Sequence, residues 1–166
     1  FPARFQLIAA MNPCPCGHLG SLQRECRCSP DEAARYQGRL SGPLLDRIDL
    51  QVEVPAVPLA ALASAPDGEP SAAIAARVAA ARERALQRQG VLNHALAGEA
   101  LQRHAALDAS GSSFLESAAQ RLGWSARGYH RTLRVARSIA DLAGSAAITL
   151  PQLAEAIQYR RVLVAR

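Results

Sequence analysis

Apolar residues recur at helical spacing through most of the chain beyond residue 70. In the segment 71–89, small and aliphatic side chains lie on one side of a 3.6-residue period and arginines lie on the other, and Gly90 follows as a C-terminal stop. Weaker patterns of the same kind predict helices over about residues 98–106 and 113–122. Ser125 and Thr149 are placed to cap two more helices, which we expect to reach about residues 143 and 160. The pattern therefore predicts a helical bundle.

The first third of the chain contains two segments with the pattern of β-strands. Residues 5–11 are almost wholly apolar, as in a strand buried on both faces of a parallel sheet, and residues 48–54 alternate strictly between apolar and polar. Between them, Ser29-Pro30-Asp31-Glu32 is a complete helix start with a capping box, so we expect a helix to about residue 40. The predicted fold is α+β and mainly α: two strands and a helix, a cysteine-bearing loop, and then the bundle.

Prolines and a glycine interrupt the pattern between residues 55 and 70. They predict a linker and a division of the chain near residue 60, into residues 1–60 and 61–166. The chain has no run of 18 apolar residues, so we expect no membrane-spanning helix. Its first residues lack both an initiator Met and the charged and apolar regions of a signal peptide. We therefore expect a fragment of a longer, cytoplasmic protein.

All 19 basic residues of the chain are arginine, and the formal net charge is +5. A basic balance makes nucleic acid a plausible partner, although such a balance is common among proteins. The absence of lysine is more informative. A phosphate-binding P-loop needs a lysine that reaches the β- and γ-phosphates of a nucleotide, so this chain cannot carry one. We expect the isolated chain not to hydrolyse ATP.

Four cysteines are concentrated in fifteen residues as two Cys-x-Cys pairs, which are Cys14, Cys16, Cys26 and Cys28. Two close pairs across a short loop can bring four thiolates to a tetrahedral zinc ion. Two disulfides or four uncoordinated thiols are the alternatives, and disulfides are uncommon without secretion. His18 can in principle replace one thiolate. A closed four-thiolate site leaves no open position, so the expected zinc ion is structural.

The segment 40–49 (LSGPLLDRID) places Arg47 between two carboxylates, after a Gly-Pro break and two leucines. An arginine held at the entry of a strand is suited to contact a phosphate on a neighbouring molecule. This pattern resembles the arginine-finger segment of the AAA+ ATPases of the magnesium-chelatase and MCM group. Asn12 ends the first predicted strand, at the edge where open α/β sheets bind ligands, but the residues alone favour a simple turn cap.

Arg127, Arg131 and Arg134 form one basic stripe on the predicted helix that follows Ser125. Arg127 lies in the first turn, where the helix dipole already favours anions, so an arginine there favours a nearby anion such as a nucleotide phosphate. For Arg131 and Arg134 we expect an ordinary solvated face. The arginines of the segment 71–89 are also expected on an exposed helix face.

Several motifs, in register over essentially the whole chain, resemble the ComM/YifB family of bacterial magnesium-chelatase-like AAA+ proteins. They lie in residues 9–17, 35–36, 40–49, 125–142 and 153–160. The resemblance implies that the full protein has a Lon-protease-like domain followed by an AAA+ module, and that this chain is the last part of that module, with its helical lid. The family includes hexameric DNA helicases that move DNA branches during natural transformation.

The resemblance also implies residue roles. Asn12 falls at the sensor-1 position, Arg47 at the arginine finger that acts on the adjacent subunit's site, and Arg127 at the sensor-2 position of the lid, although Arg134 is a second candidate for sensor 2. ATP and Mg²⁺ are the implied cofactors of the full-length protein, with DNA and a homohexamer as its partners. Two other functions stay open: the motor subunit of a magnesium chelatase, and a non-enzymatic zinc-bearing module that binds nucleic acid.

Overall fold

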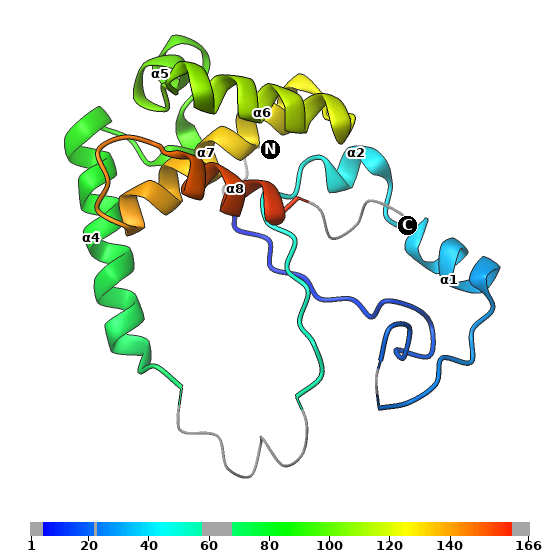
Figure 1. The fold of residues 1–166 in the computed structure, drawn as a ribbon. Helices are drawn as coiled ribbons and strands as arrows, with labels where there is room; N and C mark the ends of the chain where they lie inside the picture. Colours follow the sequence, from blue (N-terminus) through cyan, green and yellow to red (C-terminus); the bar gives the residue numbers. More distant parts are fainter. Residues whose placement is uncertain (1–4, 22, 58–67, 161–166) are drawn as a thin grey trace. The chain divides into compact units, whose positions relative to one another are not determined.

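Helices make up the regular structure of the part of the chain that the computed structural model describes, which is residues 5–21, 23–57 and 68–160 (Figure 1). The chain forms two compact units, Phe1–Leu44 and Leu45–Arg166. The elements are α1 (Pro30–Gln37), α2 (Gly42–Leu45), α4 (Ser71–Gln89), the 3-10 helix η1 (Asn93–Ala95), α5 (Gly98–His104), α6 (Ala109–Arg121), α7 (Ala126–Leu142) and α8 (Leu150–Gln158).

The first unit contains a cysteine-bearing loop and the helix α1, which begins as its sequence predicts. Ser29 caps the helix through its side chain, and Glu32 returns the bond to the Ser29 backbone, so the capping box is complete. At the other end, the Gln37 side chain donates a hydrogen bond to the Pro13 carbonyl over 2.9 Å. The helix is therefore tied to the start of the loop that precedes it.

The two predicted strands are wrong for the described residues, because neither segment 5–11 nor segment 48–54 forms a strand. Their apolar side chains are largely exposed, with Ile8 at 86% and Val54 at 85%. A strand exists only where a neighbour supplies the matching backbone groups. No sheet neighbour lies among the described residues. In the second segment, the Gln51 N–H bonds instead to the carbonyl of Tyr159, 2.7 Å away at the end of α8.

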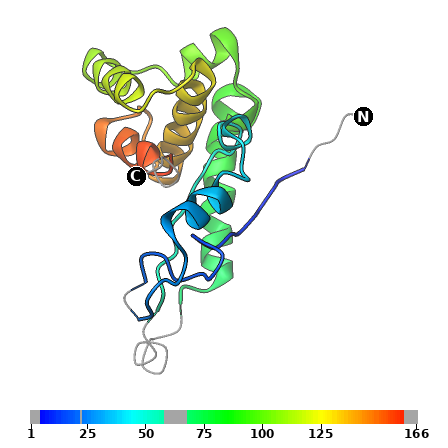
Figure 2. The same ribbon diagram turned by 90° about the vertical axis from the view of Figure 1, so that its right-hand side faces the viewer.

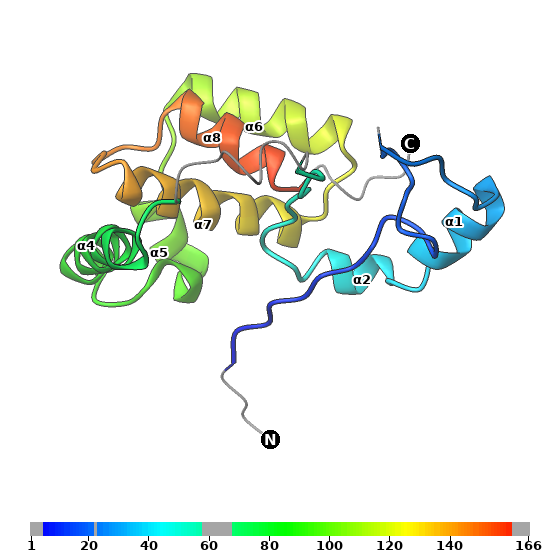
Figure 3. The ribbon, with the colours of Figure 1, turned by 90° about the horizontal axis from the view of Figure 1, so that it is seen from below.

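The second unit is built around α7. This helix packs against α8, α4, α5, α6 and η1. Figure 2 shows α4 and α7 side by side, and in Figure 3 α8 lies between α6 and α7. The core consists of small and aliphatic side chains from these helices, among them Leu96, Leu115, Ala136, Ala140 and Leu153. The predicted helical bundle is therefore confirmed.

Most predicted helices agree with the structure to within a few residues, and α6 is the exception. It begins at Ala109, earlier than the predicted start near residue 113. Asp108 is its N-cap and accepts a hydrogen bond from the Gly111 N–H over 2.7 Å. The sequence pattern does not indicate this start, because Gly111 and the two serines that follow it are weak helix formers.

A buried carboxylate, Asp141, joins three elements of the second unit. It is 2% exposed, lies near the end of α7, and accepts hydrogen bonds from Arg88 of α4, Asn93 of η1 and Arg137 of its own helix. The Arg84 side chain adds a bond to the Asp141 carbonyl over 2.9 Å. The expectation that the arginines of α4 form an exposed face therefore does not hold for the half-buried Arg88, while Arg84 is exposed as expected; both connect α4 to α7.

The predicted division near residue 60 stays a prediction about the whole protein. In this structure residues 45–57 group with the helices that follow them. The central part of the predicted linker, residues 58–67, lies outside the described residues. Within the described ranges, no helix combines the length and the apolar character needed to cross a lipid bilayer.

We predict that Asp141→Asn destabilises the second unit by about 3 kcal/mol, because it leaves the buried Arg137 and the half-buried Arg88 without a counter-charge. The measurement is the free energy of unfolding by urea at neutral pH. Glu83→Gln is the matched control, since Glu83 is exposed on α4. Equal stability of the two variants would contradict this role of Asp141.

We also predict that the stability difference between the wild type and Asp141→Asn depends on pH. Burial by itself would raise the pKa of Asp141, but hydrogen bonds from Arg88 and Asn93 and the charge of Arg137 outweigh it and lower this pKa. A lowered pKa contributes stability above the unfolded pKa of about 3.9, and that stability is lost as the pH falls through the folded pKa. The difference in unfolding free energy between wild type and Asp141→Asn should therefore narrow below about pH 4. A constant difference down to strong acid would contradict this account.

Candidate functional site

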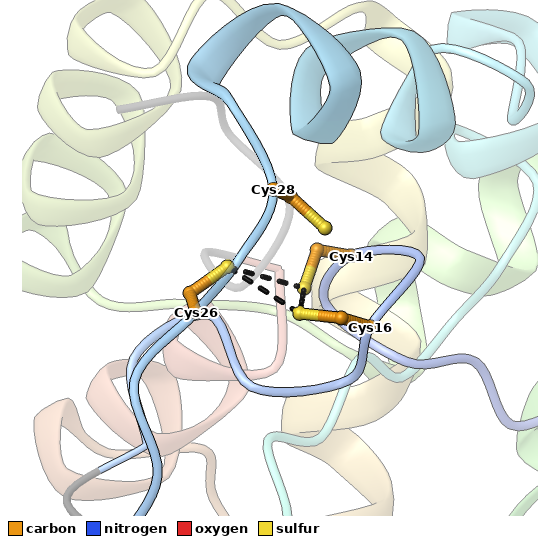
Figure 4. Close-up of side chains that lie close together, drawn as sticks. All are labelled: Cys14, Cys16, Cys26 and Cys28. Carbon is orange, nitrogen blue, oxygen red and sulfur yellow. Dashed lines mark hydrogen bonds between the residues drawn. The ribbon is translucent and has the colours of Figure 1, made fainter.

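The four cysteine side chains of the first unit point toward one another (Figure 4). Cys14 and Cys16 come from the start of the loop, and Cys26 and Cys28 come from the segment that leads into α1. All four Sγ atoms lie within 4.8 Å of one another. Cys14 is fully buried and the other three are half-buried, so the cluster is shielded without being enclosed.

Local backbone geometry holds the first pair in place. The Gly17 N–H donates to the Cys14 carbonyl over 3.0 Å, which closes a tight turn, and Gly17 has a φ of 81° that a residue with a side chain rarely adopts. The Leu19 N–H then donates to the Cys14 sulfur over 3.4 Å. On the other side, the capped start of α1 follows Cys28 directly, so the second pair is fixed by a helix end.

The sulfur positions fit a tetrahedral metal ion. Three of the Sγ–Sγ distances are 3.4 Å (Cys14–Cys16), 3.6 Å (Cys16–Cys26) and 3.7 Å (Cys14–Cys26). A tetrahedral zinc ion with Zn–S bonds near 2.3 Å requires sulfur–sulfur edges of about 3.8 Å. A disulfide requires about 2.05 Å, and all four cysteines are free thiols in this structure. The four cysteines can therefore hold a metal ion, and the disulfide alternative does not describe this structure.

The electrostatics of the cluster also favour a cation. Backbone N–H groups of His18 and Arg27 lower the pKa of Cys16 to about 5. A backbone hydrogen bond lowers the pKa of Cys28 as well, but burial and the neighbouring sulfurs, including the charge on Cys14, raise it to about 12. The thiols therefore oppose one another's ionisation. Four thiolates exist together only with a positive charge between them, which a divalent metal supplies.

His18 is not needed to complete this site. It is half-buried and lines a shallow hollow beside the cluster with Cys16, Arg24 and Cys26. Among the described residues, the converging metal-ligating atoms are the four cysteine sulfurs alone. Asn12 lies two residues before Cys14, exposed, with its side-chain amide facing the Gly17 turn. Its predicted sensor-1 role stays a prediction.

Arg47 belongs to the second unit and lies in a turn just after α2, closed by the Ile48 N–H bonding to the Leu45 carbonyl over 3.1 Å. The Arg47 residue is exposed. Asp46 beside it accepts hydrogen bonds from Arg160 over 2.9 Å and from the Ser125 hydroxyl over 2.8 Å. The segment that carries Arg47 is therefore bonded to both ends of the α7–α8 pair.

Arg127 lies in the first turn of α7, as predicted, and it is exposed. The same helix start already has an anion close by, because Asp46 bonds to the N-cap Ser125. A carboxylate of the chain itself therefore supplies part of the negative charge that the sequence argument assigned to a nucleotide phosphate. Arg127 differs from Arg131 and Arg134, which are half-buried, because it is exposed close to the bond between Ser125 and Asp46.

Arg131 and Arg134 do not form the solvated face that the sequence suggested. Arg131 forms an ion pair with Asp49, and the Arg134 Nε donates to the Leu96 carbonyl over 2.8 Å. Sequence reasoning also missed Arg160, which is 7% exposed and bonds to Asp46. Helical periodicity gives the face of an arginine, but not the distant acceptor that the side chain reaches. The only available signal was the pair of acidic residues flanking Arg47.

Known protein families match both parts of the chain. Residues 68–160 match the model described as "Magnesium chelatase, subunit ChlI C-terminal", and residues 1–62 match "Magnesium chelatase, subunit ChlI". The chain belongs to the magnesium chelatase ChlI family. The two matches are separated by residues 63–67, and together they include both the cysteine cluster and helices α4 to α8.

Curated relatives place the chain near the ComM-like members of this family. It is 46% identical to "Competence protein ComM" of Haemophilus influenzae over 164 residues, which is 98% of this chain. It is 45% identical to YifB of Salmonella typhimurium over 163 residues (98%) and 42% identical to Mb2921c of Mycobacterium bovis over 165 residues (97%). In each case the chain spans 32% of the relative's length. It is thus a ComM-like AAA+ segment.

We predict that the chain binds one equivalent of cobalt(II), a probe of thiolate sites, with an absorption band from sulfur-to-metal charge transfer. Cys14→Ser should greatly weaken this binding, because it removes the most buried ligand of the set. His18→Ala is the control and should bind cobalt as the wild type does. Loss of the band in His18→Ala, or its retention in Cys14→Ser, would contradict the four-sulfur site.

Proposed function

We propose that this chain is the sensor-1, arginine-finger and sensor-2 portion, with the helical lid, of a hexameric AAA+ ATPase that moves DNA as a helicase or branch-migration motor. The observation that carries this proposal is the arrangement of the second unit. There, the segment bearing Arg47 is bonded to the start of the helix on which Arg127 lies exposed. The matches to the chelatase family and to ComM support it.

In this proposal Arg47 reaches the γ-phosphate of ATP bound to the adjacent subunit. A guanidinium is always charged and presents a planar set of donors, so it stabilises the charge that develops on the transferred phosphoryl group. Arg127 contacts ATP bound by its own subunit, at the start of α7, where backbone N–H groups also favour an anion. Asn12 orients the attacking water. ATP, Mg²⁺ and the P-loop belong to the full-length protein.

Zinc is the metal we propose for the cysteine cluster. Tetrahedral sites of four thiolates are typical of zinc, and the sulfur spacing described above agrees with its bond length. Four protein ligands leave no place for water or substrate, so the ion would hold residues 14–28 in shape rather than take part in catalysis. In the cobalt titration, zinc is then expected to displace cobalt stoichiometrically.

A second candidate function is the motor subunit of a magnesium chelatase, because both family descriptions name that enzyme. The two functions use the same ATPase parts and differ in what stimulates them. DNA-stimulated ATP hydrolysis by the full-length protein supports the DNA motor, and stimulation only by a porphyrin-binding partner supports the chelatase. DNA binding without any ATPase activity in the full-length protein would favour a nucleic-acid-binding module.

We predict that Arg47→Ala in the full-length protein leaves ATP binding nearly intact and lowers ATP turnover, by as much as about 10³-fold if Arg47 is a full arginine finger. The measurement is steady-state ATP hydrolysis beside nucleotide binding. Mixing Arg47→Ala subunits with subunits disabled at the P-loop should restore part of the activity, since finger and P-loop come from opposite sides of one interface. Absence of restoration at every ratio would exclude action between subunits.

We predict that Arg127→Ala weakens ATP binding by the full-length protein without lowering its thermal stability, because Arg127 is exposed and Ala favours the helix. Arg134→Ala should do the reverse. It removes the bond to the Leu96 carbonyl, so it should lower stability with less effect on ATP affinity. Binding is measured by titration with a fluorescent ATP analogue. A larger loss of affinity in Arg134→Ala would move the sensor-2 role to Arg134.

A further inference from the structure

Both acidic residues that flank Arg47 are bonded to the helical part of the same unit. Asp46 accepts from Arg160 over 2.9 Å and from the hydroxyl of Ser125 over 2.8 Å. Asp49 forms an ion pair with Arg131, one turn along α7 from the helix start. Arg47 therefore lies between two acidic residues that are each bonded to the helical part of the unit.

The backbone of the same segment is attached as well. Arg160 donates through its second guanidinium nitrogen to the Ile48 carbonyl over 3.3 Å. The Gln51 N–H donates to the Tyr159 carbonyl over 2.7 Å. Of the six residues from 46 to 51, four therefore bond to α7 or to the end of α8: Asp46, Ile48, Asp49 and Gln51.

The helix start is shaped to receive this segment. Gly128 is buried in the first turn of α7, and a Cβ added there would lie 3.3 Å from the Asp46 carboxylate and 3.3 Å from the Arg160 guanidinium. Alanine is the better helix former at an interior position. A glycine at this place leaves room for the ion pair to lie directly against the helix.

Arg160 is the residue on which most of these contacts depend. Its guanidinium bonds to Asp46 and to the Ile48 carbonyl and lies over the Trp124 ring, 5.7 Å from the ring centre. The side chain is 6% exposed. A planar group with five donors can hold two acceptors and an aromatic face at once, which fixes the segment in position and in orientation.

We propose that these contacts form a clamp that makes the Arg47 segment and the lid helix α7 move as one body, so that ATP bound at Arg127 controls how Arg47 is presented to the neighbouring subunit. The clamp consists of Asp46, Asp49, Ser125, Arg131 and Arg160. They are positioning residues, because they act through Arg47 and touch no substrate. The functional part of this proposal rests on the proposed function, and the clamp itself does not.

Helix stability alone does not account for the clamp. Ser125 already accepts the Gly128 N–H over 3.1 Å, so α7 has its N-cap without Asp46. The Asp49 side chain is 54% exposed, and ion pairs at that exposure contribute little to folding. Asp49 and Arg131 therefore matter chiefly for where the segment lies, and they are the pair with which positioning can be tested without unfolding the protein.

The test uses the full-length protein and exchanges the charges of this pair. Asp49→Arg breaks the ion pair, Asp49→Asn is its milder form, and Asp49→Arg combined with Arg131→Asp restores the pair in reverse. Glu53→Arg is the matched control, because it makes the same charge change at an exposed residue of the same segment. Thermal melting first identifies any variant that fails to fold.

Amide hydrogen exchange of peptides covering residues 45–51 reports the clamp directly. We expect faster exchange, at the Gln51 amide among others, in Asp49→Arg and Asp49→Asn, and wild-type exchange in the reversed pair and in Glu53→Arg. Unchanged exchange in both Asp49 variants would overturn the clamp, whatever the protein's function is.

ATP hydrolysis then reports positioning. We expect Asp49→Arg to lower kcat by about tenfold with KM for ATP changed less than about twofold, and the reversed pair to recover most of that loss. Faster exchange with an unaltered kcat, in a protein where Arg47→Ala does lower turnover, would overturn the positioning role and leave the proposed function standing. No effect of Arg47→Ala itself would overturn both.

Discussion

The buried carboxylate of Asp141 is the interaction on which the helical unit depends. It is surrounded by two guanidinium groups and an amide that come from three different elements. Arg137 also bonds to the carbonyls of Ser145 and Ala146, so the turn after α7 is held by the same group of side chains. An unpaired buried charge is costly, so Asp141 is stable in the core only when α4, η1 and α7 are packed against one another. The orientation of α4 against α7 follows from this requirement as much as from apolar packing.

The two ends of α7 are organised in the same way. At its start, Asp46 receives Arg160 and Ser125, and toward its end Asp141 receives Arg88 and Arg137. In both places an acidic residue, half-buried Asp46 or buried Asp141, pairs with an arginine from outside α7, which is Arg160 or Arg88. The helix between them has an apolar face for α8 and α4. The polar contacts that orient α7 therefore lie at its two ends, and its middle provides the apolar packing.

What could be predicted from the sequence was whatever depends on neighbouring residues. Capping boxes, Gly90 as a left-handed C-cap, and the convergence of two Cys-x-Cys pairs are local, and all appear in the structure. The strands at residues 5–11 and 48–54 were wrong because strand formation depends on a partner. The roles of Arg88, Arg131 and Arg160 could not be predicted, because each reaches an acceptor at least 50 residues away in the sequence. The role of Asp141 could not be predicted either, because its partners Arg88 and Asn93 are also distant in the sequence.

This use of arginine changes what the basic composition means. The arginines at 84, 88, 131, 134, 137 and 160 are all committed to acceptors within the helical unit. Several of them serve two acceptors at once, for which the planar guanidinium presents its donors in a fixed geometry. All of them except the exposed Arg84 are buried or half-buried, so most of this charge is part of the fold. A surface for DNA has to be sought among the exposed arginines, such as Arg82 and Arg127. The net charge of +5 is accordingly a poor measure of nucleic-acid binding by this unit.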